Sequence, residues 1–181
     1  MLDEILRYNH HFVTTCGYEN YEAEKYPRKK LAILTCMDTR LVELLPAALG
    51  LRQGDIKLVT NAGAMIRNPY DSSALSLLIA VLELQVKEIL VIGHTDCGVK
   101  GLTAEGMIRL LKQRGIPEET FLALEKEQVD LAQFFHGFED LEASVIQSVG
   151  LLRNHPLMPK DVAVHGCIMD TRTGGLEAVT D

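Results

Sequence analysis

Two short motifs carry the side chains most able to do chemistry. The first reads Cys36-Met-Asp38-Thr-Arg40, and the second reads His94-Thr-Asp-Cys97. Two thiolates and one imidazole form a ligand set that favours zinc over magnesium or calcium. Three protein ligands are also one short of a closed structural site, as in catalytic Cys₂His zinc sites that keep one open position. We therefore predict that Cys36, His94 and Cys97 bind one Zn²⁺ ion.

Asp38 and Arg40 allow two interpretations. Asp38 or Thr39 could simply cap a helix that starts near Leu41. Alternatively, Asp38 lies two residues from a predicted zinc thiolate, where its carboxylate could ligate the metal or accept a hydrogen bond from bound water. Arg40 could then hold that carboxylate in a charge-assisted, bidentate pair. The spacing alone leaves both interpretations open.

The elements that must position these residues follow an α/β pattern. Four apolar runs rich in β-branched residues predict strands at 31–35, 56–60, 88–92 and 161–165. Between them, apolar residues recur at helical spacing over residues 41–49, 73–84, 107–114, 118–135 and 140–153. Strands that alternate with helices predict a mainly parallel central sheet of about four strands, flanked by helices on both faces.

Chemically capable residues follow the ends of these predicted strands. Cys36 and Asn61 come directly after the first two, His94 comes two residues after the third, and the fourth ends in His165 with Cys167 two residues further on. Ligand sites of open α/β sheets lie at the carboxyl ends of the strands, so these residues should meet there. His165 and Cys167 form a rival ligand pair, but we expect them to pack behind the site because three ligands are already present.

Composition narrows the class of protein. At 181 residues, 47% of them hydrophobic, the chain suits one compact domain over residues 1–181. Its net charge of −7 argues against a nucleic-acid partner. The most apolar stretch, residues 74–82, is about half as long as a membrane span requires. Asp3 and Glu4 also lie where an export signal carries positive charge, so we expect a cytoplasmic protein with reduced cysteines.

Together, the motifs resemble the signature of β-class carbonic anhydrases. The matching segments are Cys36-Met-Asp38-Thr-Arg40, Asn61-Ala-Gly63 and Gly93-His94-Thr-Asp-Cys97-Gly98, with residues 166–174 similar to the family's last strand and turn. The resemblance spans about residues 31–181, and the length is that of a small member. It implies zinc held by Cys36, His94 and Cys97, with Asp38 and Arg40 as the catalytic dyad. Asp38 would take the fourth zinc position only in a closed state.

The resemblance also implies an activity and an assembly. The activity is the reversible hydration of carbon dioxide to bicarbonate and a proton, with hydroxide formed at the zinc as the nucleophile. The assembly is a homodimer or a dimer of dimers, in which an N-terminal helical arm, residues 1–25, packs on the partner. The apolar residues of this arm recur at helical spacing: Leu2, Ile5, Leu6, Phe12, Val13 and Cys16.

Other functions stay open on the sequence. Relatives of this fold hydrolyse carbon disulfide or carbonyl sulfide at the same zinc, and the ligand motifs do not exclude that activity. A zinc-binding family member without turnover is a second alternative. A thiol redox protein that uses Cys36 and Cys97 is a third, which the neighbouring His94 disfavours. Ala64 and Met169 depart from the family pattern, which leaves the lining of the pocket undefined.

Overall fold

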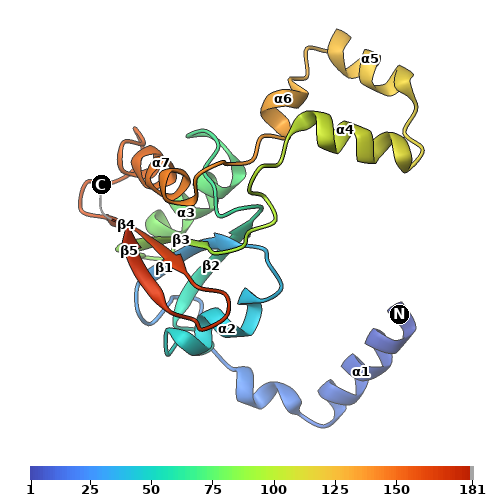
Figure 1. Ribbon diagram of the computed structural model, residues 1–181. Coiled ribbons are helices and arrows are strands. Elements are labelled where there is room, and N and C mark those ends of the chain that lie inside the picture. The colour runs from blue at the N-terminus through green and yellow to red at the C-terminus, as the bar shows by residue number, and fades with distance from the viewer. Residues whose placement is uncertain (180–181) are drawn as a thin grey trace.

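The computed structural model describes residues 1–179, in which five strands form one sheet. The strands are β1 (Leu31–Cys36), β2 (Ile56–Asn61), β3 (Glu88–His94), β4 (Ala163–Met169) and β5 (Leu176–Val179). Their order is β2-β1-β3-β4-β5, the first four run parallel, and β5 is antiparallel to β4 (Figure 1). The predicted mainly parallel sheet is confirmed, with β5 added at its edge.

Helices cover both faces of this sheet, as predicted. The helices that pack on it are α2 (Leu41–Ala48), α3 (Ser72–Leu82) and α7 (Leu141–Arg153). One apolar cluster joins α3 and α7 to strand residues such as Leu34 and Val91. The other joins α2 to Ile33 and Ile92, and it also contains Cys36 and Cys97. Two of the three predicted metal ligands therefore belong to a hydrophobic core.

The fourth strand differs from its prediction. It covers Ala163–Met169 instead of 161–165, so His165, predicted as the last residue of the strand, and Cys167, predicted to follow it, both lie inside the strand. Pairing with β3 sets these limits, because the register runs from Glu88 opposite Ala163 to His94 opposite Met169. Local apolar spacing carries no information about that partner strand.

The predicted helix over residues 118–135 is two helices. These are α5 (Glu118–Lys126) and α6 (Leu131–Phe134). Gln128 has a left-handed φ of 59°, which ends the helical path. Asp130 then starts α6, because its side chain accepts a hydrogen bond from the backbone N–H of Gln133 at 2.9 Å.

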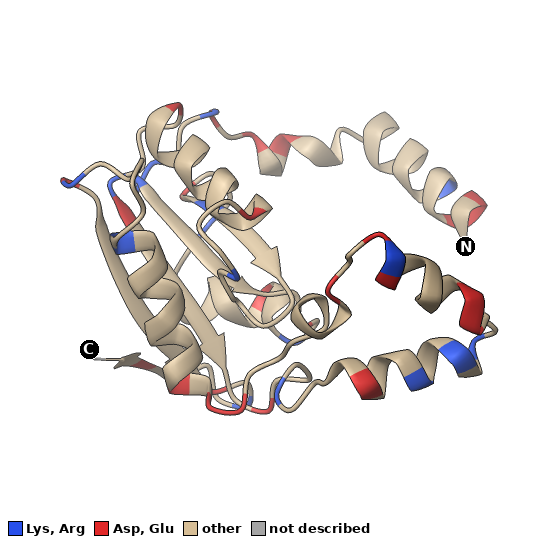
Figure 2. Ribbon diagram, turned by 90° about the horizontal axis from the view of Figure 1, so that it is seen from above, with Lys and Arg blue, Asp and Glu red and all other residues tan. Residues whose placement is uncertain are grey.

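Two helical segments extend away from the sheet (Figure 1). The N-terminal segment contains α1 (Leu2–Thr14) and the 3₁₀ helix η1 (Gly17–Tyr21), and α1 buries none of its residues. The other contains α4 (Ala104–Gln113), α5 and α6, and Figure 2 shows acidic and basic residues interspersed along α4 and α5. No helix within residues 1–179 is long and apolar enough to cross a membrane.

Candidate metal centre

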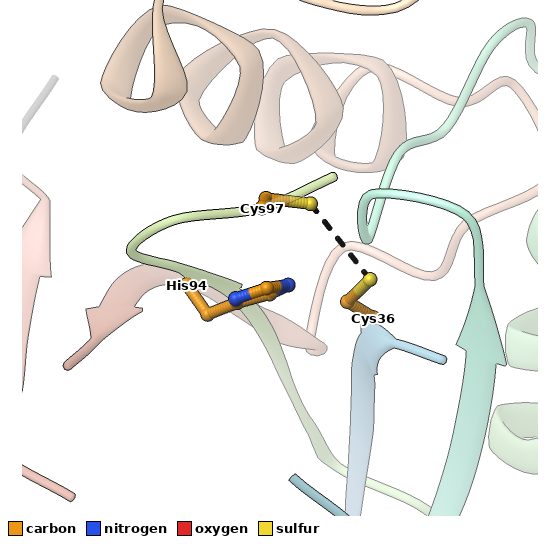
Figure 3. Close-up of side chains that lie close together, drawn as sticks. All are labelled: Cys36, His94 and Cys97. Carbon is orange, nitrogen blue, oxygen red and sulfur yellow. Dashed lines mark hydrogen bonds between the residues drawn. The ribbon is translucent and has the colours of Figure 1, made fainter. Parts of the chain in front are cut away.

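The structure brings the three predicted ligands together. Cys36 ends β1, His94 ends the neighbouring β3, and Cys97 lies in the turn that follows (Figure 3). The Cys36 and Cys97 sulfur atoms are 3.9 Å apart. One ligand atom from each of the three residues lies within 4.8 Å of the other two, and all three residues are buried. Within residues 1–179, this is the one group of three candidate ligands that meets this spacing.

The His94 ring is oriented for a ligand. Its Nδ1 lies 2.9 Å from the carbonyl oxygen of Thr95, so Nδ1 carries the proton and Nε2 presents its lone pair. Nε2 is buried and has no hydrogen-bond partner. An unsatisfied buried polar atom costs about 1–3 kcal/mol. A metal ion bound to Nε2 would remove that cost, and the two adjacent sulfur atoms make a donor set that suits zinc.

The two thiols differ in acidity. In the metal-free protein, burial raises the pKa of Cys36, but a protonated His94 and the backbone N–H groups of Gly63 and Asp38 outweigh burial and lower it to about 7. Burial, with the adjacent Cys36 as a further contribution, raises the pKa of Cys97 to about 11. A bound cation deprotonates a coordinating thiol, so a metal ion would bring both sulfur atoms to the thiolate form.

Arg40 holds both carboxylate oxygens of Asp38. Its Nε donates to Oδ1 at 2.9 Å and its Nη2 donates to Oδ2 at 2.8 Å. This pairing keeps the pKa of Asp38 well below its usual range. Asp38 Oδ2 lies 3.9 Å from His94 Nε2, which places an ionised oxygen beside the candidate metal position.

Asp38 also shapes the turn before α2, although neither Asp38 nor Thr39 is the N-cap of that helix, so the capping interpretation from the sequence is wrong. Its Oδ1 accepts a hydrogen bond from the backbone N–H of Arg40 at 2.9 Å. Arg40 is the N-cap of α2 and makes no side-chain capping bond. The two oxygens of Asp38 therefore have different roles. Oδ1 accepts the backbone hydrogen bond of the turn, whereas Oδ2 lies beside the candidate metal position.

Sequence reasoning missed Asp96. Its Oδ2 accepts from Arg40 Nη1 at 2.9 Å, and its backbone oxygen accepts from Arg40 Nη2 at 2.8 Å. Asp96 has a left-handed φ of 54° and an exposed side chain. Arg40 thus links the Asp38 segment to the turn between His94 and Cys97. Its position between the two ligands was the only signal in the sequence.

The rival ligand pair lies apart from this centre. His165 is half exposed, and its Nε2 lies 3.3 Å from Glu88 Oε1. Cys167 is buried opposite Ile92, and burial raises its pKa. The expectation that His165 packs behind the site is wrong, because its side chain faces solvent beside Glu88 at the start of β3.

Comparison with known proteins identifies the family. The protein-family model described as "Carbonic anhydrase" matches residues 31–176. A Bacillus subtilis protein named "Putative carbonic anhydrase YtiB" is 45% identical over 181 residues, which cover 100% of this chain and 97% of that protein. The crystal structure of a β-carbonic anhydrase from Trichomonas vaginalis superposes with a TM-score of 0.87 at 28% identity, over 100% of this chain and 98% of that one. The chain belongs to the carbonic anhydrase family and, within it, to the β class.

A further relative has a different activity in its name. The carbon disulfide hydrolase of Acidianus sp. (strain A1-3) is 32% identical over 158 residues, which cover 80% of this chain and 74% of that protein. Family membership therefore leaves more than one substrate to consider.

Proposed function

We propose that this protein is a zinc-dependent carbonic anhydrase that hydrates carbon dioxide reversibly, so that CO₂ and H₂O give HCO₃⁻ and H⁺. The observation that carries the proposal is the buried Cys36, His94 and Cys97 cluster beside an ionised Asp38. A structural zinc site would have four protein ligands, whereas this cluster supplies three. The 45% identity to a Bacillus protein named for this activity supports the same choice.

Cys36, His94 and Cys97 would hold the metal, since their ligand atoms converge and His94 Nε2 has no other partner. Zinc bound there would supply a Lewis acid that lowers the pKa of water towards neutrality. Arg40 keeps Asp38 ionised by pairing with both carboxylate oxygens. An ionised carboxylate only accepts hydrogen bonds, so Asp38 Oδ2 orients the attacking water.

Arg40 also restrains Asp38. A bidentate pair fixes the plane of a carboxylate as well as its position. Asp96 accepts hydrogen bonds from Nη1 and Nη2 of the same guanidinium group. Asp38 therefore stays a hydrogen-bond acceptor and is kept from joining the three ligands.

Apolar residues next to the thiols suit an uncharged substrate. Met65, Val99 and Phe138 belong to the same buried cluster as Cys36 and Cys97. They surround Gly63, where a Cβ atom would lie 3.3–3.4 Å from each of their side chains. Carbon dioxide has no net dipole, so it loses little hydration free energy on entering apolar surroundings. Charged bicarbonate loses much more, so it is disfavoured there and leaves.

Carbon disulfide is the second candidate substrate, because the Acidianus relative carries that activity in its name. Its hydrolysis, CS₂ + 2 H₂O → CO₂ + 2 H₂S, also needs an activated water at the metal. Parallel assays of carbon dioxide hydration and hydrogen sulfide release, on one preparation of measured zinc content, distinguish the two. Rapid hydration without sulfide supports our proposal. Sulfide release without hydration contradicts it, and zinc-loaded protein inactive in both assays indicates a non-catalytic zinc protein.

We also propose a homodimer, or a dimer of dimers, built through the N-terminal arm. Helix α1 exposes five large hydrophobic side chains to solvent: Leu2, Ile5, Leu6, Tyr8 and Val13. In the single chain, α1 contacts mainly η1, including the Phe12 and Tyr21 rings at 5.9 Å. Exposed apolar side chains gathered on one helix are typical of a protein–protein interface. The four unpaired cysteines of the described residues support the cytoplasm as the location.

A further inference from the structure

The side-chain amide of Asn61, the last residue of β2, uses both of its donors and its acceptor. Nδ2 donates to the carbonyl oxygen of Met65 at 2.7 Å and to Ser73 Oγ at 2.9 Å. Oδ1 accepts from the backbone N–H of Met65 at 3.0 Å. The opposite amide orientation would set oxygen against the Met65 carbonyl and NH₂ against the Met65 N–H. A carboxylate of the same shape lacks both donors, so the contacts require asparagine.

These bonds close a tight turn between Asn61 and Met65. Its central residues have left-handed backbones, with φ values of 87° at Gly63 and 57° at Ala64. An alanine in this conformation is unfavourable and persists only where surrounding contacts hold it. The Asn61 amide stabilises this conformation, because it hydrogen-bonds to both the carbonyl oxygen and the N–H of Met65. Ser73, in the first turn of α3, anchors the amide to a helix.

The turn delivers a hydrogen bond to a predicted metal ligand. The backbone N–H of Gly63 points at Cys36 Sγ, with a nitrogen–sulfur distance of 3.4 Å. A hydrogen bond to a thiolate withdraws electron density from the sulfur and orients its lone pairs. Because two thiolates would already give much electron density to the metal, this bond adjusts how strongly the metal polarises water.

We propose that Asn61 is a positioning residue of the metal centre, which holds the 61–65 turn so that the Gly63 N–H tunes the Cys36 thiolate. The inference rests on the proposed function only in taking Cys36 as a metal ligand. It concerns the strength of the metal–sulfur bond, which is measured without turnover.

Cobalt(II)-substituted protein tests this role, because its thiolate-to-cobalt absorption band reports electron density on the sulfur. Asn61→Asp keeps the shape and removes both donors, while Asn61→Ala removes the amide without adding charge. In both variants the band should move to longer wavelength, because the sulfur loses a hydrogen bond that withdraws electron density. Zinc affinity by chelator competition should fall about 10- to 100-fold, because the turn no longer holds Cys36 oriented for the metal. Asn68→Asp is the matched control, because Asn68 is exposed and its Oδ1 only accepts from the Tyr70 N–H at 2.9 Å. That control should change neither value.

Several results would overturn the inference. Unchanged band position and zinc affinity in both Asn61 variants would leave Asn61 a purely structural residue, even if their melting temperatures fell. If neither variant folds, Ser73→Ala decides, because it removes one partner of Nδ2 and should shift the band by a smaller amount in the same direction. An unchanged Ser73→Ala spectrum would then refute the role. Absent carbon dioxide hydration would defeat only the proposed activity, whereas an unshifted band in Cys36→Ser would defeat both proposals.

Discussion

Replacement of Arg40 by alanine separates a catalytic Asp38 from one that only shapes a turn. Arg40 gives Asp38 three hydrogen bonds, from Nε, Nη2 and the backbone N–H, at 2.9, 2.8 and 2.9 Å. Arg40→Ala removes the first two and keeps the third. The bond that shapes the turn survives, so a residue that served only the turn would lose little. Oδ2, however, loses its Nη2 donor while it lies 3.9 Å from His94 Nε2.

The freed carboxylate should then join the metal ligands. Loss of a group that orients a metal ligand or its neighbour typically costs about 10- to 100-fold in activity. We expect the upper part of that range for kcat/KM of carbon dioxide hydration, because both side-chain bonds to Asp38 disappear together. Zinc content should stay near one per chain, and zinc X-ray absorption should report an added carboxylate oxygen. Arg40→Lys should be intermediate, since an ammonium group cannot make the bidentate pair.

Two further variants complete the test. Arg172→Ala is the matched control, since Arg172 follows an Asp-Thr pair in the same way and its backbone N–H binds Asp170. It should keep normal activity. Asp38→Ala should lose activity without an added carboxylate at zinc, because the acceptor itself is gone. Near-normal hydration by both Arg40→Ala and Asp38→Ala, with zinc retained, would refute the dyad and leave Asp38 as a turn residue.

Three other predictions follow from the structure. Cys97→Ser should lose most bound zinc and Cys167→Ser should keep it, by metal analysis; the reverse pattern would refute the ligand assignment. Deletion of residues 1–18 should abolish the dimer or cause aggregation, by light scattering, and a soluble, fully active monomer would contradict the arm's role. Hydrogen bonds from the Arg52 N–H and Arg28 lower the pKa of Asp55 in the folded protein. The ionised Asp55 therefore contributes its full stabilisation above its unfolded-state pKa of about 3.9, and this contribution declines as the pH falls towards its folded-state pKa. Asp55→Asn should therefore melt earlier than the parent protein at pH 7, with a difference that shrinks below about pH 4; a constant difference would contradict this account.

The sequence predicted the sheet and the convergence of the ligands because both depend on simple regularities. Apolar runs alternate with helical spacing, and parallel strands bring their carboxyl ends to one edge. Cys36 and His94 end neighbouring strands, so topology alone placed them together. The limits of β4 depend on its pairing with β3, which no local pattern records.

The contacts around the ligands could not be predicted in the same way. Asp96 reaches Arg40 from a turn between His94 and Cys97 that adopts a left-handed conformation at Asp96. The Gly63 N–H meets Cys36 within a turn that the Asn61 amide spans by its hydrogen bond from the Met65 N–H. Each contact depends on the three-dimensional path of a loop, whereas the spacing of residue types reports strands and helices.

A zinc add-back titration tests the central claim most directly. Metal-free protein is supplied with increasing zinc, and carbon dioxide hydration is followed by stopped flow alongside Cys36→Ser protein. We predict that the rate rises linearly and reaches its maximum at one zinc per chain, while Cys36→Ser stays inactive throughout. Full activity in the metal-free protein, or a hydration rate that does not change with the amount of bound zinc, would contradict the proposal of a zinc-dependent carbonic anhydrase.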